Sequence, residues 1–565
     1  MSKAQATVDE LVTMVETGQL RLPEMQRRYV WRATRVRDLL DSLYRGYPSG
    51  TILIWDTEYD VPLQEFSIEQ AKNPYPSTRL LLDGQQRITS LAAVIRGIPV
   101  KVRGRKKPID LLFNLDHPEG LSFVTEVEEE SEDDEAITSG VEPEFTEDEL
   151  QRRFQQMTFL VATNKLANQP NWVKVSEVFI TTSDSKFLSR MGIERIDDPR
   201  YEKYSERLAR LRSIKNYEYR MDILERTMSY DEVTEIFVRV NSLGAKLRSS
   251  DLALAQITAK WPNSLALFES FQGEYSNSGF DLDLSLFLRA MVAMTTHQSR
   301  FKSVGSLPRE QLEKGWKTAC EGMNFALNMM KSNLSIDSPA LLSSPFILIA
   351  VAYFGHKKDY KLSPEESRLL SKWILLANAK ARYSRGSSET ILDQDIALLR
   401  DGGGAAEMLE RLLLQVGRLE VLPGDLEGRN QRSALFKTMF LAFRKAGAKD
   451  WFSQLEISVD HVGVAHNLQF HHIFPKAILK GIHVTKDIDD IANLAFIAGR
   501  TNRKISANPP SEYLPALIKS LGNGPFVAQC IPADYELLTV DRYEQFLSER
   551  RKLIAERLNV FLEVI

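Results

Sequence analysis

The feature that most constrains the fold is a run of three leucines that leads into five polar residues and then into an apolar segment. Residues 80–82 predict a buried β-strand, residues 83–87 a turn, and residues 88–95 a helix. The residues around this unit predict a helix that is capped by Thr7 and stopped by Gly18, a helix at 34–45, and strands at 51–55 and 109–115. Strands that alternate with helices indicate an α/β domain.

The rest of the chain is predicted to be rich in helix. Residues 217–224 alternate like a strand, residues 231–257 predict helix, turn, helix, and residues 261–444 are almost wholly helical in pattern. A His-rich segment follows, and an amphipathic helix at 543–561 ends the chain. The predicted fold class is therefore a multi-domain, helix-rich α+β protein. Its predicted domains are residues 1–257, a helical connecting region at 258–433, and residues 434–565.

Composition excludes several classes of protein. The 565 residues include 72 Lys+Arg and 76 Asp+Glu, so a uniformly basic nucleic-acid coat is excluded and contacts to nucleic acid require local patches. Only Cys320 and Cys530 occur, which cannot build a disulfide framework and favour a reducing compartment. The start of the chain has no apolar signal-peptide core, and the longest apolar run, residues 346–354, is too short for a bilayer. We expect a soluble, cytoplasmic protein.

An acidic block interrupts the first predicted domain at residues 126–149. Seven of its acidic residues stand almost side by side between positions 128 and 135, so the block should repel itself and form a solvated loop. An alternative is that the block mimics nucleic acid and covers a basic groove. The sequence leaves its role open.

The turn at residues 83–87 has the chemistry of a phosphate site. It lies at the carboxyl end of a predicted strand, where α/β sheets bind ligands, and before a helix whose N-terminus attracts anions. Gly84 permits a sharp turn, and Arg87 can fork onto phosphate oxygens. Gln85 and Gln86 can position a water or contact a base, and Asp83 can hold a metal ion or orient that water. The structural alternative is a turn in which Asp83 caps the helix and Arg87 is solvated.

Two further segments carry polar residues beside apolar ones. The first, residues 22–31, holds a second Gln-Arg pair, Gln26 and Arg27, whereas its Tyr29 and Trp31 are expected in the core. The second, residues 237–251, contains Asn241 and joins two predicted helices through Gly244. A DNA-binding helix-turn-helix also fits the second segment. It is disfavoured because residues 252–257 are strongly apolar and should be buried.

These three segments, in this order, resemble the DGQQR-motif nucleotidase domain of GmrSD-type restriction and phage-defence proteins, which has a ParB/sulfiredoxin-like fold. The resemblance covers about residues 1–257 and includes an intact DGQQR motif at residues 83–87. It implies binding and hydrolysis of a nucleoside triphosphate, with Asp83 and Arg87 as catalytic residues. The implied nucleotide-binding residues are Gln26, Arg27, Asp83, Gly84, Gln85, Gln86, Arg87 and Asn241. The chain has no Gly-Lys dipeptide, so a P-loop is absent.

A second constellation lies near the end of the chain. Residues 470–475 contain adjacent histidines, His471 and His472, in a chain that has only eight. A second apolar strand is predicted at 493–497, and residues 500–504 then open a helix or loop. Neutral imidazole can take a proton from water near pH 7, and one imidazole with one carboxamide oxygen leaves a divalent cation open to phosphate. The alternative is that these residues only cap strands, fill the core and form turns.

This layout resembles the HNH (His-Me finger, ββα-metal) nucleases, over about residues 434–565. The resemblance implies that His472 is the general base, that His471 and Asn502 hold the metal, and that Asn493 supports the loop of the base. Arg500, Arg503 and Lys504 are suited to hold the DNA backbone. The chain lacks the paired cysteines of some HNH domains, so helices must give that support. His461 and His466 are expected to be structural, and His483 has no assigned role.

Together the resemblances imply an NTP-regulated, metal-dependent DNA endonuclease of bacterial phage defence that targets modified DNA. The expected cofactor is Mg²⁺ or Mn²⁺, and a nucleoside triphosphate is the expected substrate or effector. DNA is the expected partner, and no membrane is expected to take part. A homo-oligomer is left open. Two alternatives stand beside this expectation: a nucleotide-switched DNA-binding regulator without nuclease activity, and an RNA-cleaving toxin.

Overall fold

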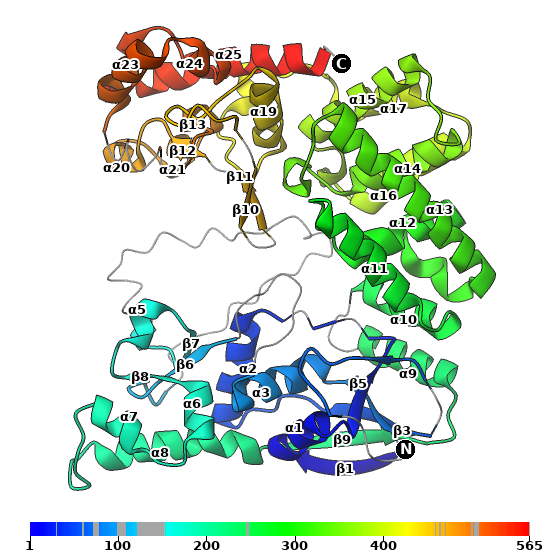
Figure 1. The fold of residues 1–565 in the computed structure, drawn as a ribbon, viewed down its shortest axis with the longest axis vertical. Coiled ribbons are helices and arrows are strands. Elements are labelled where there is room, and N and C mark those ends of the chain that lie inside the picture. The colour runs from blue at the N-terminus through cyan, green and yellow to red at the C-terminus, as the bar shows by residue number, and fades with distance from the viewer. Residues whose placement is uncertain are drawn as a thin grey trace. The chain divides into compact units, whose positions relative to one another are not determined.

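The chain forms two compact units in the computed structural model, Met1–Leu265 and Ala266–Ile565 (Figure 1). The structure describes residues 1–26, 28–29, 31–58, 61–71, 78–98, 109–120, 152, 154–243, 248–457, 459–462, 465–468, 470–498, 501, 505 and 508–563. The predicted acidic loop at 126–149 lies outside these residues. Helices and a mixed N-terminal sheet together give the α+β class that the sequence predicts.

A six-stranded mixed sheet organises the described part of the first unit. Its strand order is β1-β9-β3-β5-β2-β4, in which β5 pairs parallel with β2 and antiparallel with β3. The strands and helices predicted before residue 96 are confirmed, as is the strand predicted at 217–224. The strands are β1 (Ser2–Thr7), β2 (Leu20–Pro23), β3 (Ile52–Thr57), β4 (Leu63–Gln64), β5 (Thr78–Asp83) and β9 (Glu218–Leu224). The helices in this part of the chain are α1 (Val8–Glu16), α2 (Ala33–Arg45) and α3 (Gln85–Arg96).

The three leucines of β5 are buried because the sheet is covered on both faces. Leu81 packs into a core with α1, α2 and α3, whereas Leu80 and Leu82 point to the opposite face. There they meet Val233 of α9 (Tyr230–Leu243) and Ala255 of α10 (Ser249–Lys260). Successive strand residues alternate between faces, so an uninterrupted apolar run is what a strand covered on both sides requires.

The predicted strand at 109–115 belongs to a second, smaller sheet. This sheet has the order β7-β6-β8 and is antiparallel throughout. Its strands are β6 (Leu111–Asn114), β7 (Phe159–Val161) and β8 (Trp172–Lys174). The helices that follow in the first unit are α5 (Asn164–Ala167), α6 (Val175–Ile180), α7 (Ser185–Arg190) and α8 (Tyr201–Arg212).

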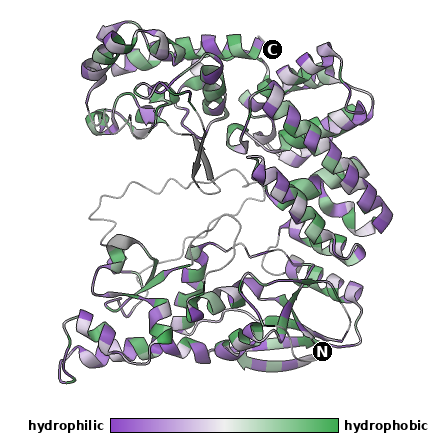
Figure 2. Ribbon diagram, viewed as in Figure 1, coloured by the Kyte–Doolittle hydropathy of each residue, from purple (hydrophilic) through white to green (hydrophobic). Residues whose placement is uncertain are grey.

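Helices dominate the first part of the second unit, as predicted. Helix α14 (Phe346–Lys357) is buried almost all round and packs against α12, α13, α15 and α16. No helix in the described residues is long and apolar enough to cross a bilayer. The other helices here are α11 (Ser264–Asn277), α12 (Leu284–Thr296), α13 (Arg309–Asn328), α15 (Pro364–Ala379), α16 (Ser388–Arg400), α17 (Ala405–Val416) and α18 (Pro423–Leu426). Hydrophobic and hydrophilic segments alternate along many helices, as amphipathic packing requires (Figure 2).

Short strands follow in the His-rich segment. The two-residue strands β12 (His471–His472) and β13 (Leu494–Ala495) pair antiparallel, with His472 opposite Leu494. A separate hairpin joins β10 (Val459–Val462) and β11 (Ala465–Leu468), and its register places His461 opposite His466. The helices of this region are α19 (Ala434–Lys445), α20 (Lys476–Leu479), α21 (Thr485–Ile488), α23 (Pro510–Leu521), α24 (Gly524–Ala528) and α25 (Tyr543–Glu563). The predicted boundaries at 257 and 433 stay predictions.

Candidate functional site

The first candidate site is the turn between β5 and α3. Gly84 is the residue before the helix, and its backbone φ of 101° lies in the left-handed region. A Cβ atom at Gly84 would lie 2.4 Å from Cδ1 of Ile52, so a side chain cannot be accommodated without movement. The sharp turn expected at Gly84 is therefore confirmed.

Arg87 ties this turn to the loop before β3. Its guanidinium donates to the carbonyl oxygens of Ser49 and Thr51 and, at 2.9 Å, to the carboxylate of Asp83. A Cβ atom at Gly50 would lie 2.5 Å from Nη1 of Arg87, so a glycine makes room for the guanidinium. The alternative with a solvated Arg87 is wrong: the side chain is 14% exposed, because three of its five N–H donors are used inside the protein. Asp83 pairs with Arg87 rather than capping α3.

The two Gln-Arg stretches of the sequence meet in the fold. Gln26 is buried, and its side-chain amide donates to the carbonyl oxygen of Leu81 in β5. Gln86, in the first turn of α3, accepts from the backbone nitrogen of Trp31 at 3.2 Å. Tyr29 is buried, as predicted, and its hydroxyl lies 2.7 Å from Oγ of Ser90 in α3. The structure therefore brings Gln26, Tyr29 and Trp31 onto the strand, turn and helix around residues 83–87.

Among the remaining residues predicted for the nucleotide site, Gln85 and Asn241 are described by the structure and Arg27 is not. Gln85 is buried in the first turn of α3. Asn241 lies on α9, where its side-chain amide donates to the carbonyl oxygen of Phe237 at 2.7 Å, a bond within the helix. Arg27 and Gly244 lie outside the described residues. Helix α10 is buried through Leu254, Ala255 and Ile257 among others, as expected for packing rather than DNA contact.

The second candidate site surrounds the paired histidines. Nε2 of His472 lies 2.8 Å from Oδ1 of Asp489, and Nζ of Lys476 lies 2.9 Å from the same oxygen. Burial alone would raise the pKa of Asp489, but its bonds to Lys476 and His472 outweigh burial and lower the pKa. An ionised carboxylate only accepts hydrogen bonds, so Nε2 of His472 carries the proton in this pair. In the neutral form of the ring, Nδ1 then carries the lone pair.

His471 is held in its neutral form. Burial, together with the neighbouring His472, lowers the pKa of His471 to about 4. A neutral imidazole that is only partly buried can offer the lone pair of a ring nitrogen to a divalent cation. The second predicted ligand, Asn502, lies outside the described residues, as do Arg500, Arg503 and Lys504. Within the described residues, no three His, Cys, Asp or Glu side chains gather as a metal site.

Asn493 supports the backbone that follows His472. It is fully buried, and its amide oxygen accepts from the backbone nitrogen of Phe474 at 2.9 Å. Its amide nitrogen donates to the carbonyl oxygens of Phe474 at 3.1 Å and Ile488 at 3.0 Å. One side chain therefore links the histidine strand to the loop that carries Asp489.

Helices also support this site. The sequence predicts such support, because the chain lacks the paired cysteines of some HNH domains. The hydroxyl of Tyr513 in α23 donates to the Ile473 carbonyl oxygen at 2.8 Å. From α25, Arg550 donates to the Ala492 carbonyl oxygen at 2.7 Å and Tyr543 to that of Asp487 at 2.8 Å. Arg550 is fully buried, and burial lowers its pKa to about 10.

Asp450 fixes the chain that leads toward residue 502. Its carboxylate accepts from the backbone nitrogen of Ala498 at 2.7 Å and from the Thr501 hydroxyl at 2.7 Å. It also accepts from the backbone and hydroxyl of Ser453, each at 2.8 Å. Burial would raise the pKa of Asp450, but these hydrogen bonds outweigh burial and lower it.

Sequence reasoning missed the supporting residues of the second site. Asp489 belongs to the run Asp-Ile-Asp-Asp at 487–490, which has the pattern of a solvated turn. Tyr513 and Arg550 are separated in sequence from the residues they hold, so no local spacing indicates them. His483, which had no assigned role, packs against the Tyr543 ring with centroids 4.8 Å apart.

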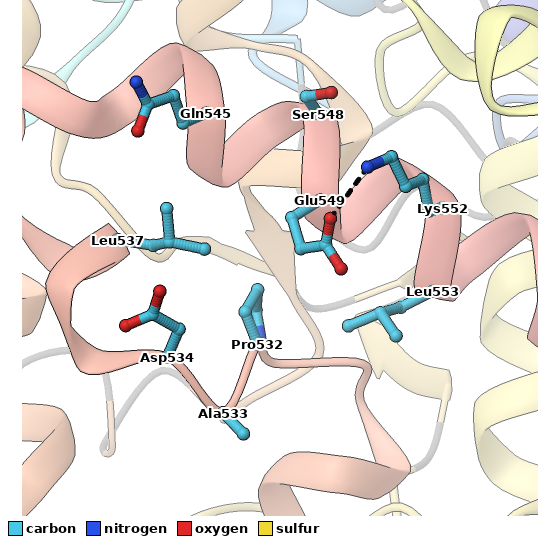
Figure 3. Close-up of a pocket in the computed structure, with 9 residues that line it drawn as sticks. All are labelled: Pro532, Ala533, Asp534, Leu537, Gln545, Ser548, Glu549, Lys552 and Leu553. Carbon is cyan, nitrogen blue, oxygen red and sulfur yellow. Dashed lines mark hydrogen bonds and ion pairs between the residues drawn. The ribbon is translucent and has the colours of Figure 1, made fainter.

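A cavity of about 660 Å³ lies elsewhere in the second unit (Figure 3). It is lined by residues 532–534, Leu537 and one face of α25, where Lys552 and Glu549 form an ion pair at 3.0 Å. None of the predicted site residues lines this cavity.

Comparison with known proteins gives two findings. Residues 8–258 match the family model described as "GmrSD restriction endonuclease, N-terminal domain". The chain is also 23% identical over 550 residues to an uncharacterized protein of Methanocaldococcus jannaschii, MJ0686, in an alignment that covers 90% of this chain and 86% of that protein. The first match agrees in extent with the resemblance seen over residues 1–257. The N-terminal part of the chain is thus similar to the N-terminal domain of the GmrSD restriction endonucleases.

Proposed function

We propose that this protein is an NTP-regulated, metal-dependent DNA endonuclease that defends a bacterium against phage and targets modified DNA. One observation carries the proposal: His472 is oriented by Asp489 and stands beside a neutral His471, on backbone that Asn493 supports. Hydrolysis of a phosphodiester needs a positioned base and a cation, and this cluster can provide the base and one ligand. The match to the GmrSD N-terminal domain supports the restriction context.

In the proposed reaction, Nδ1 of His472 takes one proton from a water molecule. The water oxygen forms a bond to phosphorus while the bond from phosphorus to the leaving sugar oxygen breaks. The leaving oxygen receives a proton from solvent. His471 and Asn502 would hold a divalent cation, Mg²⁺ or Mn²⁺, which when bound supplies positive charge for the phosphate and the leaving oxygen. Arg500, Arg503 and Lys504 would hold the DNA backbone.

The first unit would bind and hydrolyse the nucleoside triphosphate at the turn between β5 and α3. The N-terminus of α3 attracts phosphate, and Asp83 presents a partly exposed carboxylate beside it. Gln26, Arg27, Gln85, Gln86 and Asn241 are the further residues proposed for this site. Because three Arg87 donors already hold the turn, we assign Arg87 first to shaping the site.

The proposed function is tested with purified full-length protein on modified and unmodified DNA of identical sequence. Each nucleoside triphosphate is added in turn, with Mg²⁺ or Mn²⁺ and with EDTA as the metal-free control. Cleavage that needs both metal and a triphosphate, and that favours modified DNA, supports the proposal. Intact DNA that nevertheless binds in a triphosphate-dependent way would identify a regulator. Preferential loss of RNA in a parallel reaction would identify a toxin.

A further inference from the structure

Asp489 is the acidic partner of His472, from a loop that the sequence does not mark. Its Oδ1 lies 2.8 Å from Nε2 of His472 and 2.9 Å from Nζ of Lys476. The carboxylate of Asp489 is 24% exposed and the His472 ring 16% exposed, so the pair is shielded from most of the solvent. A charge-assisted bond in such a setting fixes the orientation of a ring more firmly than a bond on an open surface.

The loop that carries Asp489 is already held by other groups. Tyr543 donates to the carbonyl oxygen of Asp487, and Asn493 donates to that of Ile488. The side chain of Asp490 is buried, pairs with Arg551 at 2.6 Å and accepts from the backbone nitrogen of Gly428 at 2.7 Å. Because these bonds fix the loop, the Asp489 carboxylate can act mainly on the two side chains that it contacts.

We propose that Asp489 is a positioning residue that holds His472 in the tautomer with the proton on Nε2, and that Lys476 keeps the Asp489 carboxylate in place. This inference rests on the proposed nuclease function. With Nε2–H donated to Asp489, Nδ1 is the ring nitrogen that accepts the proton from water. When that proton arrives, the ring becomes positively charged, and the adjacent carboxylate stabilises the charge.

Replacing Asp489 by Asn keeps the size of the side chain but allows its NH₂ group to donate. The ring can then turn its lone pair toward residue 489, which removes the base from the water. An oriented His-Asp pair loses roughly 10²- to 10⁴-fold in turnover when its carboxylate becomes an amide. We expect a kcat loss of this order for Asp489→Asn, an unchanged Kd for DNA, and partial recovery in Asp489→Glu. Lys476→Met is expected to give a smaller loss.

The test combines kinetics with ring spectroscopy on the full-length chain. Single-turnover cleavage is measured for the wild type, Asp489→Asn, Asp489→Glu and Lys476→Met. Asp487→Asn is the matched control, since it removes a carboxylate from the same loop without touching the His472 pair. In protein labelled with ¹⁵N-histidine, the His472 ring is assigned by its loss in His472→Gln, and its tautomer is compared between wild type and Asp489→Asn. Thermal melting verifies that each variant is folded.

The outcomes separate this inference from the proposed function. A slower Asp489→Asn with a changed His472 tautomer, beside a normal Asp487→Asn, supports the inference. An Asp489→Asn variant that cuts at the wild-type rate with the wild-type tautomer overturns it and leaves the nuclease function standing. If wild-type protein cuts no DNA, both the proposed function and the catalytic role of Asp489 are wrong. The ¹⁵N spectra then still decide whether Asp489 orients the ring, and an unchanged tautomer in Asp489→Asn overturns that part as well.

Discussion

Asn493 and Phe474 are joined by two hydrogen bonds, because the amide oxygen of Asn493 accepts from the Phe474 backbone nitrogen at 2.9 Å and its amide nitrogen donates to the Phe474 carbonyl oxygen at 3.1 Å. Phe474 follows His472 by two positions, so this pair of bonds sets the path of the chain next to the proposed base. A third bond, to Ile488, joins the same amide to the loop of Asp489. The buried Asn493 therefore connects both halves of the His472–Asp489 pair.

Replacing Asn493 by Ala is predicted to destabilise the second unit and to slow DNA cleavage. Three buried backbone groups would lose their partner, at a cost of about 2–4 kcal/mol in the free energy of unfolding. Urea unfolding and cleavage rates at a temperature where the variant is folded measure the two effects. The exposed Asn508→Ala serves as control and should change neither. Equal stability of both variants would contradict the claim that Asn493 supports the backbone that follows His472.

Replacing Gly84 by Ala is predicted to destabilise the first unit by about 1–3 kcal/mol, because a non-glycine residue is strained at this backbone φ. The new methyl group would also meet Ile52. Gly120→Ala is the matched control in the same unit, since its added Cβ has no neighbour within 4 Å and its φ lies outside the left-handed region. Thermal melts of both variants check the prediction, and equal melting temperatures would count against it.

Replacing Arg87 by Lys is predicted to lower triphosphate hydrolysis at least tenfold, since a lysine cannot reach Ser49, Thr51 and Asp83 together. Release of phosphate by the full-length protein measures the effect. Arg79→Lys, on an exposed position of the same strand β5, should hydrolyse at the normal rate. Normal hydrolysis by Arg87→Lys would place the nucleotide chemistry elsewhere in the chain.

His117 is predicted to make the first unit sensitive to acid. Burial lowers its pKa from 6.5 to about 4, against the raising effect of its bond to the Pro118 carbonyl oxygen. The unfolded chain therefore binds a proton between these pH values while the folded chain does not, so stability falls as pH falls through this window. At about 1.4 kcal/mol per pKa unit, the loss is on the order of 2–3 kcal/mol.

The check is urea unfolding from pH 7 to pH 4 for wild type and His117→Gln. Glutamine can still accept from the Tyr44 hydroxyl, which lies 3.0 Å from Nε2 of His117, but it does not titrate. The variant should lose less stability than the wild type over this range. Parallel curves for the two proteins would show that His117 does not cause the acid sensitivity.

The sequence predicts most of the secondary structure that positions the two sites. The leucines of β5 and the polar turn after them predict strand, turn and helix. An apolar run marks a strand that is buried on both faces, and a glycine marks the positive φ of the turn, so both signals are visible in the local sequence. The cap at Thr7 is likewise local and is confirmed, and Glu10 completes a capping box with it. Such signals depend on residues a few positions apart.

Contacts between distant segments could not be predicted in the same way. Arg87 was expected either to bind phosphate or to be solvated, but carbonyl groups 36 and 38 positions away take its donors. Asp489 gains its role from a histidine 17 positions earlier, and Arg550 supports a carbonyl 58 positions before it. Hydrogen-bond partners at such separations follow from the folded path of the chain, which no local pattern encodes.

The most direct test of the central claim is the single-turnover rate of DNA cleavage by His472→Ala. His483→Ala, a histidine of the same segment that packs on Tyr543, is the matched control. The proposed mechanism predicts a loss of at least about 10²-fold for His472→Ala, while triphosphate hydrolysis and the His483→Ala rate stay normal. Cleavage by His472→Ala at the wild-type rate would contradict the claim that this ring is the base of a nuclease.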